Sequence, residues 1–471
     1  MFARILKRFL RRFQCCKQSQ KQKRRMKVTL FLILTFICIA YAWPENWKPI
    51  RRAHENDVIQ FTLALQQRNL EEFNRIFESV TTPGSENYGK YLTIEEVNEI
   101  IAPSEEEQQL VLNYLAEHSC TGTSYGDFII ANGPISAVEE MFQVDMFEFR
   151  EESLSITLKR SINGPTIPTQ LNNIVQFVTG IATFPATRNV RDRKVRTIEE
   201  AARVGDTWVV PQTLRSIYGI PATAVGTNPN NAMAVVEFGA IAGVSQTDLD
   251  TFNTLVDGPS NQFLNYTVGP FGFSPINPID GESTLDVQYI MAVAPGVDCS
   301  FWTIDGWVYD FTVLVQQRQQ QNEPVPWVFS LSYAWSEDLQ CEVTGNGASC
   351  AQVGGSDQSY ASTTSTNFQK IGITGITLLS ASGDAGAASK ANIGCTNTTY
   401  PIQAEFPASS PFITAVGGTM LSNGGSPLTG NLPPFCEKTG VTCAGSGTEV
   451  VCSVPTALIT SGGGFSSFLP Q

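Results

Sequence analysis

The second half of the chain alternates short apolar runs with helical stretches, and this alternation most strongly limits the folds open to it. Three runs have the character of buried strands: Asn231–Ala240, Val325–Trp335 and Gly375–Asp384. Helical stretches lie between them, at Gly243–Val256, from Glu282 onward and at Thr364–Ile373. Because strands separated by helices form a parallel sheet, the sequence predicts an α/β domain over residues 209–471. In such sheets, active residues gather at the carboxyl ends of strands.

Residues 43–187 have a different texture, mixed and charged, without a regular strand–helix–strand pattern. The stretch DVIQFTLALQQ is typical of a strand, and NLEEFNRIFESV of an amphipathic helix. Thr93 and Ser104 precede acidic first turns and are predicted helix caps. YGDFIIANGP and MFEFREESLSITLKR have strand character with turn residues. This mixture predicts a small α+β domain.

The first 42 residues are predicted to be a signal peptide or an uncleaved signal anchor. They hold eleven Lys/Arg and no acid, and MKVTLFLILTFICIAYA ends in a small-x-small pattern. The apolar run is shorter than the roughly 20 residues of a transmembrane helix, which favours cleavage. We therefore expect the secretory pathway, with a secreted or lysosomal product, and a membrane contact only if the leader is uncleaved.

Residues 188–208 are polar and dense in charge. They are predicted to form an exposed linker with a processing site, since exposed polar linkers are preferred sites of nicking. A solvated surface helix is the alternative.

Cysteines and sequons fit a lumenal protein. Eight cysteines follow Ala42, and the spacings Cys341/Cys350 and Cys436/Cys443 suit small closed loops, although connectivity cannot be deduced from sequence. Seven of the eight lie after residue 298, so one is expected to lack a partner. Asn265 and Asn397 stand in Asn-x-Thr sequons and are candidate glycosylation sites.

The distribution of charged residues argues against some classes of function. From residue 201 onward there are six Lys/Arg against twenty Asp/Glu. An acidic body argues against nucleic acid as a partner, and suits work at low pH, where protonation relieves self-repulsion. Both histidines lie in the first quarter, so the later part lacks the usual general base and the commonest metal ligand.

The candidate catalytic groups are therefore carboxyls. Glu282 and Asp286 stand at i and i+4 of a predicted helix and share one face. The structural alternative is a pair of first-turn acids, with Ser283-x-x-Asp286 as a capping box. Asp384 follows the predicted strand GITLLS, and its alternative is a turn acid. Paired carboxylates titrate in acid, and a protonated Asp donates to an oxyanion.

Several co-ordered motifs resemble the sedolisin family of serine-carboxyl peptidases. GESTLDVQYIMAVAP resembles its Glu-x-x-x-Asp helix, and four further stretches match in the same order: SLSYAW, LLSASGDAG, FPASSPFITAVGGT and SGGGFSSF. Residues 61–97 resemble its activation prodomain, and the resemblance covers about Val58 to Gln471. It implies a subtilisin-like α/β catalytic domain behind an α+β propeptide.

The resemblance also implies roles for single residues. Glu282 would be the general base, Asp286 would hold and tune it, and Asp384 would stabilise the oxyanion. Ser332 and Tyr333 would line the substrate cleft. The substrate would be a polypeptide, the propeptide an intramolecular inhibitor, and Ca²⁺ the ion of a family loop near the C-terminus, with no metal site inside this chain. Endopeptidase and tripeptidyl-peptidase activity both remain open.

One family feature is missing from the sequence. The family's nucleophile stands in a Ser-Gly-Thr-Ser motif after SGGGF, and this chain ends at Gln471 before such a motif. We expect a truncated peptidase domain, with the nucleophile beyond the chain and no activity in the chain as given. One rival is a catalytically inactive binding or inhibitory protein of the same fold. Another is a glycoside hydrolase, which needs its carboxyls on opposite sides of a sugar rather than side by side.

Overall fold

The computed structural model describes most of the chain after the leader. The described residues are 46–151, 156–185, 207–239, 243–260, 262–270, 280–341, 343, 355–388, 399, 401–454, 457 and 459–470. The predicted leader, linker residues 188–206, Asn397, Cys350 and Cys395 lie outside them. Within the described residues, no helix combines the length and the hydropathy that crossing a membrane requires.

The N-terminal domain (residues 46–185) has the α+β composition that its sequence predicts. Two antiparallel sheets have the strand orders β3-β4-β2-β7 and β1-β5-β6. The elements are β1 (Trp47–Arg52), β2 (Val58–Leu65), α3 (Leu70–Thr81), α4 (Ile94–Ile101), α5 (Glu105–Glu117), β3 (Thr121–Ser124), β4 (Phe128–Pro134), α6 (Ile135–Phe142), β5 (Met146–Glu151), β6 (Ile156–Ser161) and β7 (Val175–Thr179).

Two predicted caps start helices of this domain. The Thr93 hydroxyl accepts from the Glu96 amide, and the Glu96 carboxylate accepts from the Thr93 amide at 2.8 Å. Ser104 and Glu107 repeat this capping box at α5. Each box satisfies backbone donors that a helix start leaves without an internal partner.

The C-terminal domain (residues 207–470) is built on a parallel sheet. Six strands run in the order β10-β11-β9-β12-β14-β16, and each neighbouring pair is parallel. The α/β prediction is therefore confirmed, with the three predicted strands at β9, β12 and β14. The helices and main-sheet strands are α8 (Pro211–Ile217), β9 (Ala232–Phe238), α9 (Gln246–Leu255), β10 (Leu264–Val268), α10 (Gly281–Val293), β11 (Asp298–Ile304), α11 (Val308–Gln320), β12 (Val328–Leu331), α13 (Asp357–Ile373), β14 (Thr377–Ala381), β16 (Thr414–Val416) and α14 (Pro434–Thr439).

Short strands flank this sheet. They form pairs or triplets in the orders β13-β15, β17-β20 and β18-β19-β8. Their bounds, with those of the 3₁₀ turns, are β8 (Thr207–Trp208), β13 (Trp335–Ser336), η1 (Glu337–Leu339), η2 (Gly386–Ala388), β15 (Glu405–Phe406), β17 (Thr419–Leu421), η4 (Ser422–Gly424), β18 (Ser426–Pro427), β19 (Thr442–Ser446) and β20 (Glu449–Val451).

The two faces of the main sheet have separate apolar cores. Along β9, Met233 and Val235 belong to a core with residues of α9 and α10, whereas Ala234 and Val236 belong to a core with residues of α11 and α13. Successive side chains of a strand point to opposite faces, so one strand supplies both layers. Helix α10 therefore lies on the face opposite α11 and α13.

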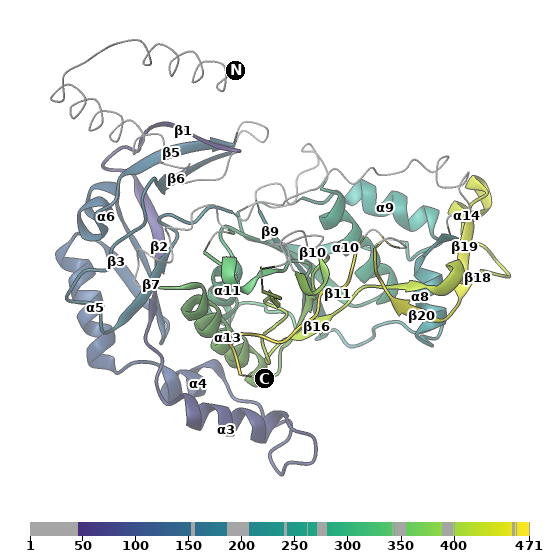
Figure 1. Cartoon of the computed structure of the whole chain (residues 1–471), viewed down its shortest axis with the longest axis horizontal. Helices are drawn as coiled ribbons and strands as arrows, with labels where there is room; N and C mark the ends of the chain where they lie inside the picture. The colour runs from purple at the N-terminus through teal and green to yellow at the C-terminus, as the bar shows by residue number, and fades with distance from the viewer. Residues whose placement is uncertain are drawn as a thin grey trace. The chain divides into compact units, whose positions relative to one another are not determined.

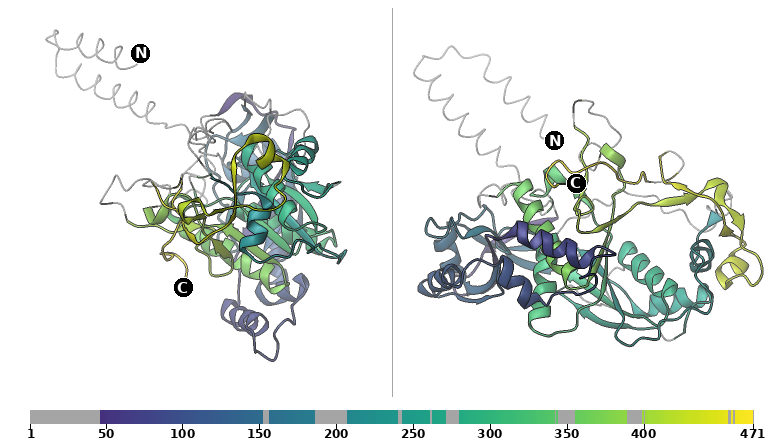
Figure 2. Two further views of the ribbon diagram at one scale, coloured as in Figure 1. Left: turned by 90° about the vertical axis from the view of Figure 1, so that its right-hand side faces the viewer. Right: turned by 90° about the horizontal axis from the view of Figure 1, so that it is seen from below.

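The N-terminal domain packs against α11 and α13 (Figure 1). The Phe177 ring of β7 lies 4.8 Å from the Tyr309 ring and 5.7 Å from the Tyr360 ring, measured between centroids. Two ion pairs, Lys370–Asp127 and Arg160–Asp305, also join the two domains. In Figure 1 and the right view of Figure 2, the N-terminal domain and the yellow hairpin of α14 and β19 lie at opposite ends of the described residues.

The cysteines divide into bonded and free. Cys436 and Cys443 form a disulfide, which confirms one of the two suggested loops. Cys341 is also disulfide-bonded, while Cys350 lies outside the described residues. Cys120 and Cys452 are free thiols, and both are buried, as is Cys299.

Candidate active site

Helix α10 carries the two predicted catalytic acids. It begins at Gly281, and Glu282 and Asp286 are both half-buried. Asp280 is the N-cap, because its carboxylate accepts from the Ser283 amide at 3.1 Å. The capping-box alternative for Ser283 and Asp286 is therefore wrong. Ser283 is fully buried inside the first turn, which leaves Asp286 for another role.

A loop after β12 reaches the Asp286 carboxylate. The Ser332 hydroxyl donates a hydrogen bond to Asp286 Oδ2. Ser332 directly follows the last residue of β12, so the contact lies at the carboxyl end of an inner strand of the main sheet. This is the edge where parallel α/β sheets place their ligand sites.

The neighbouring residue, Tyr333, points into the protein. It is 8% exposed, and its hydroxyl donates to Glu237 Oε2 at 2.8 Å. The rings of Phe238 and Trp307 lie 5.2 and 6.4 Å from the Tyr333 ring. A role for Tyr333 in lining the substrate cleft therefore stays a prediction, and it would fall to its backbone rather than to its buried side chain.

Glu237 is a carboxyl group that the sequence reasoning missed. It is fully buried near the end of β9, the strand that neighbours β12. A buried carboxyl needs hydrogen-bond partners, and the Tyr333 hydroxyl is one. The signal available in the sequence was a single acid inside the apolar run AMAVVEF. Ser332 and Tyr333 thus connect one loop to two carboxyls, Asp286 and Glu237.

Asp384 lies just beyond β14, with its side chain exposed. Its carbonyl accepts from the Thr460 amide at 2.9 Å, and the Gly462 amide donates to Gly383 O at 2.9 Å. A Cβ on Gly462 would lie 1.8 Å from Ser382 O, so only glycine permits this approach. The glycine-rich motif near the C-terminus therefore lies against the loop that bears Asp384.

The charge of Asp384 affects the pKa of the Cys452 thiol. Burial raises the pKa of Cys452, and the Asp384 carboxylate raises it further. The Cys452 amide also donates to Gly418 O at 3.1 Å, and the Ser461 hydroxyl donates to the same carbonyl at 2.5 Å. The motifs that carry Asp384, Gly418 and Ser461 are thus neighbours in space.

Other predicted sites are placed less completely. Asn265 belongs to the edge strand β10, and its glycosylation stays a prediction. No group of three or more His, Cys, Asp or Glu side chains within the described ranges is arranged to hold a metal ion.

Comparisons with known proteins cover both domains. The profile of the pro-kumamolisin activation domain matches residues 45–184. Physarolisin of Physarum polycephalum is 34% identical over 453 residues, which cover 94% of this chain and 74% of that protein. Tripeptidyl-peptidase 1 of Canis lupus familiaris is 28% identical over 450 residues, covering 91% of this chain and 69% of that protein. A solved structure of Pseudomonas sedolisin, a serine-carboxyl proteinase, is 23% identical with a TM-score of 0.37, covering 56% of this chain and 64% of its own.

Proposed function

This chain belongs to the sedolisin family of serine-carboxyl peptidases, and we propose that it is the precursor of an acid-acting peptidase that uses a serine, a glutamate and an aspartate. The observation that carries the proposal is the hydrogen bond from Ser332 to Asp286 at the carboxyl edge of the sheet. It gives the second carboxyl of the Glu-x-x-x-Asp helix a partner in the loop that the resemblance assigns to the substrate cleft.

In the proposed mechanism Glu282 is the general base. It takes the proton of the attacking serine hydroxyl while the serine oxygen bonds to the scissile carbonyl carbon and the carbonyl electron pair moves to oxygen. When the tetrahedral intermediate collapses, the C–N bond breaks, and Glu282 returns the proton to the leaving amine. A water molecule then repeats the sequence on the acyl-enzyme. A carboxylate suits this role below pH 5, where a histidine of ordinary pKa is already protonated.

Asp286 orients and tunes that base. Because Ser332 donates to Asp286, the carboxyl of Asp286 is fixed in direction on the α10 face that it shares with Glu282. Two neighbouring carboxyls that share a proton titrate at separated pKa values, which keeps one available as a base in acid. Tyr333 extends the arrangement to Glu237.

Asp384 is proposed to stabilise the oxyanion. A protonated aspartic acid at this exposed loop would donate a hydrogen bond to the negative oxygen of the tetrahedral intermediate, an effect that typically contributes about 3–4 kcal/mol. The contact between the Asp384 loop and the Ser461–Gly464 stretch supports this role, since both matched motifs then border one site.

The attacking serine is proposed to lie in the Ser-Gly-Thr-Ser motif that the resemblance places after SGGGF, beyond Gln471. The family's Ca²⁺ loop is proposed to lie there as well, and no step is derived through that ion. Gly122-Thr123-Ser124 has the same residues as the last three of that motif. It does not supply the nucleophile in this proposal, since Thr121–Ser124 form β3 of the N-terminal domain.

The N-terminal domain is proposed to act as an inhibitory propeptide that is released after cleavage within residues 188–208. Phe184 is fully buried against Trp47 and Phe149. Thr207 and Trp208, predicted as the last two linker residues, instead form β8 of the C-terminal domain, where Trp208 packs on Phe435. Before that cleavage, the ion pairs Lys370–Asp127 and Arg160–Asp305 hold the N-terminal domain against the C-terminal domain. A secretory route, ending outside the cell or in lysosomes, and polypeptide substrates complete the proposal.

The experiment compares two Glu→Gln variants in a polypeptide extended to include the Ser-Gly-Thr-Ser motif. Glu282→Gln is expected to lower kcat by about 10²–10⁴-fold at pH 4. Glu323→Gln removes an exposed acid paired with Arg318 and is the matched control, expected to keep wild-type turnover. Near-normal turnover of Glu282→Gln would refute the assigned base.

Serine-dependent hydrolysis by residues 1–471 alone would refute the proposed position of the nucleophile and favour a serine inside this chain. Failure of the extended wild-type polypeptide to hydrolyse any peptide would favour a binding or inhibitory protein.

A further inference from the structure

The residues from Thr207 onward pack against other parts of the C-terminal domain. We call residues Thr207–Ile217, which comprise β8 and α8, the junction segment. Its β8 pairs in parallel with β19, with Thr207 opposite Thr442 and Trp208 opposite Cys443. The Trp208 ring lies 5.2 Å from the Phe435 ring, measured between centroids.

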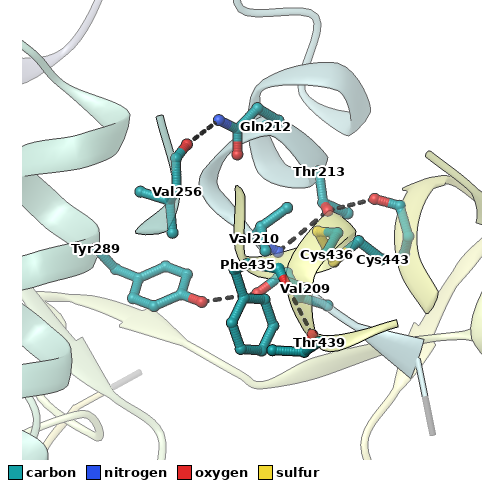
Figure 3. Close-up of a disulfide and its surroundings, with 11 residues drawn as sticks. Val209, Val210, Gln212, Thr213, Val256, Tyr289, Phe435, Cys436, Thr439 and Cys443 are labelled. Atoms are coloured by element: carbon teal, nitrogen blue, oxygen red, sulfur yellow. Dashed lines mark hydrogen bonds between the residues drawn. A yellow bond between two sulfur atoms is a disulfide. The ribbon is translucent and has the colours of Figure 1, made fainter. Parts of the chain in front are cut away.

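The partner of the junction segment is a hairpin closed by a disulfide. We call residues Pro434–Ser446, comprising α14 and β19, the disulfide hairpin; the Cys436–Cys443 bond closes it. Figure 3 shows the bond beside Val210 and Thr213. The Thr213 hydroxyl accepts from the Val210 amide at 3.1 Å and donates to the carbonyl of Ala444. Thr213 is fully buried and Val210 is 3% exposed, so this contact is shielded from water.

The same junction segment contacts helix α10 through two side chains. The Tyr289 hydroxyl, from α10, donates to Val209 O at 2.7 Å (Figure 3). The Arg215 guanidinium, from α8, donates to Val293 O at 3.0 Å. Val293 is the last residue of α10, where carbonyls lack an internal partner and a cation is favoured by the helix dipole. Arg215 also donates to Ala224 O at 3.0 Å, so its position is fixed from two sides.

Tyr289 lies on the face of α10 that bears the acids. Glu282, Asp286 and Tyr289 stand at i, i+4 and i+7, a spacing that forms one stripe along a helix. Val287 and Met291 lie on a different stripe and pack into the core against the sheet. Apolar packing resists lifting of a helix from a sheet, but it resists sliding and rotation less than directed hydrogen bonds do. Burial raises the pKa of Tyr289, so its hydroxyl remains a donor across the acidic and neutral range.

We propose that the junction segment and the disulfide hairpin form a brace that fixes the position of α10, with Tyr289 and Arg215 as its positioning residues. The inference rests on the proposed function only in that Glu282 and Asp286 are taken as the reacting pair. The brace contacts α10 in its second half, away from the acids, and touches no reacting atom. Its effect reaches them through the helix, because a displacement of about 1 Å in a catalytic group reduces a rate by up to about 100-fold.

A brace predicts a result that a simple packing role does not. Losing it should loosen α10 selectively, while the sheet and the N-terminal domain keep their protection. Amide hydrogen exchange resolves such local opening from global unfolding. Tyr289→Phe removes one hydroxyl and keeps the ring, whose centroid lies 5.4 Å from that of Phe252, so we expect the variant to keep the fold. Tyr218→Phe is the matched control, since its hydroxyl donates to Glu449 at 2.7 Å and not to α10.

The experiment measures hydrogen exchange by mass spectrometry on the protein and three variants: Tyr289→Phe, Tyr218→Phe, and Cys436→Ser with Cys443→Ser. We expect peptides within Gly281–Val293 to exchange about tenfold faster in Tyr289→Phe, as loss of one hydrogen bond of ordinary net strength implies. The double Cys variant should speed exchange in the disulfide hairpin and in α10 together. Tyr218→Phe should match the wild type at α10.

Two outcomes would overturn the brace. One is unchanged exchange at α10 in both Tyr289→Phe and the double Cys variant. The other is a uniform increase across the whole C-terminal domain, which would indicate loss of stability alone.

A kinetic arm uses the extended polypeptide that carries the serine motif. Tyr289→Phe is expected to lower kcat about 10- to 100-fold with KM changed by less than about twofold, because the acids move while the cleft remains. Tyr218→Phe should keep both constants. A rise in KM alone would contradict a positioning role. An inactive wild-type polypeptide would count against the proposed function, whereas the exchange data would still decide whether α10 is braced.

Discussion

Two ion pairs join the N-terminal and C-terminal domains, and they differ in their access to water. Lys370 and Asp127, from α13 and the turn before β4, have side chains that are 0% and 2% exposed. Arg160 and Asp305, from β6 and the loop after β11, are 8% and 30% exposed. The first pair is enclosed by protein, whereas the second meets solvent at its carboxylate. The same pairing of charges should therefore have different energetic consequences at the two places.

The neighbours of each pair reinforce the difference. Asp127 also accepts from Gln67 Nε2 at 2.7 Å, and Lys370 Nζ lies 6.0 Å from the centre of the Phe128 ring. Burial lowers the pKa of Lys370, and the Asp127 carboxylate opposes that shift. At the other pair, one Arg160 nitrogen contacts both Asp305 oxygens at 2.8 Å. If one partner of the enclosed pair is removed, water does not hydrate the remaining charge. If Arg160 is removed, water can still hydrate the Asp305 carboxylate.

The largest expected effect comes from breaking the enclosed pair. Lys370→Met leaves the Asp127 carboxylate buried without its cation, which should reduce the free energy of the first unfolding transition by about 3–5 kcal/mol at pH 7. Urea unfolding, followed by a signal that reports separation of the two domains, measures this change. Replacing both partners, Lys370→Met with Asp127→Leu, should restore most of the loss because no unpaired charge remains. A loss below about 1 kcal/mol in Lys370→Met would show that the pair is hydrated after all.

Neither pair was identified from the sequence, and the reason is physical. Asp127 and Lys370 are 243 positions apart, and each belongs to a local pattern that an ordinary surface residue would also satisfy. Apolar runs predicted β9, β12 and β14, and capping residues before acidic first turns predicted the helix starts at Thr93 and Ser104. These are local signals. They do not report which partner a distant element brings.

The same limit explains the misses at the candidate site. The i,i+4 spacing placed Glu282 and Asp286 on one helix face, as observed for the helix that bears them. Glu237 was missed because one acid in an apolar strand does not reveal that Tyr333 will reach it. The capping-box alternative named Ser283 and not Asp280, because both residues offer capping oxygens and only the backbone decides between them. The Cys436–Cys443 pairing was one of several that spacing allowed.

A second prediction concerns how the stability of the protein depends on pH near the Arg160–Asp305 pair. Asp310 lines the interdomain cavity with Arg160 and Asp305, and burial raises its pKa from 3.8 to about 6. The Trp307 amide, which donates to Asp310 at 3.0 Å, and the Arg160 charge oppose the shift, while Asp305 adds to it. Because the folded-state pKa is the higher one, the folded protein binds this proton more tightly. The contribution of Asp310 to stability therefore falls as pH rises from about 4 to 6, then stays constant.

Asp310→Asn removes that dependence. We expect it to raise the free energy of unfolding by about 2–3 kcal/mol at pH 7, and to match the wild type near pH 4, where the wild-type carboxyl is protonated. Urea unfolding at pH 4, 5, 6 and 7 tests the slope. Protonation of Asp310 thus favours the folded protein in acid. A variant whose advantage is the same at every pH would contradict this assignment.

The third prediction returns to the partner of Arg160. Asp305→Asn removes the negative charge and keeps one acceptor oxygen, so the expected loss is about 1 kcal/mol, reduced from the buried case because the carboxylate is partly hydrated. The loss should shrink in 0.5 M NaCl, where exposed charges are screened within a few ångström, whereas the loss in Lys370→Met should not. Equal salt dependence of the two variants would remove the contrast between enclosed and exposed pairs.

The smallest effect is expected at a pair that does not cross between domains. Arg51 and Glu148, on β1 and β5, are 71% and 16% exposed, and the Arg51 guanidinium lies 2.6 Å from the Glu148 carboxylate. Arg51→Gln should change the free energy of unfolding by about 0.5 kcal/mol or less, since a solvated arginine gains little from its partner and loses side-chain freedom in holding it. It provides the baseline for the other variants, because the same type of contact is measured with an arginine that is 71% exposed. If Arg51→Gln destabilised the protein as much as Asp305→Asn does, exposure would not be what ranks these pairs, and the geometry of each contact would have to be compared instead.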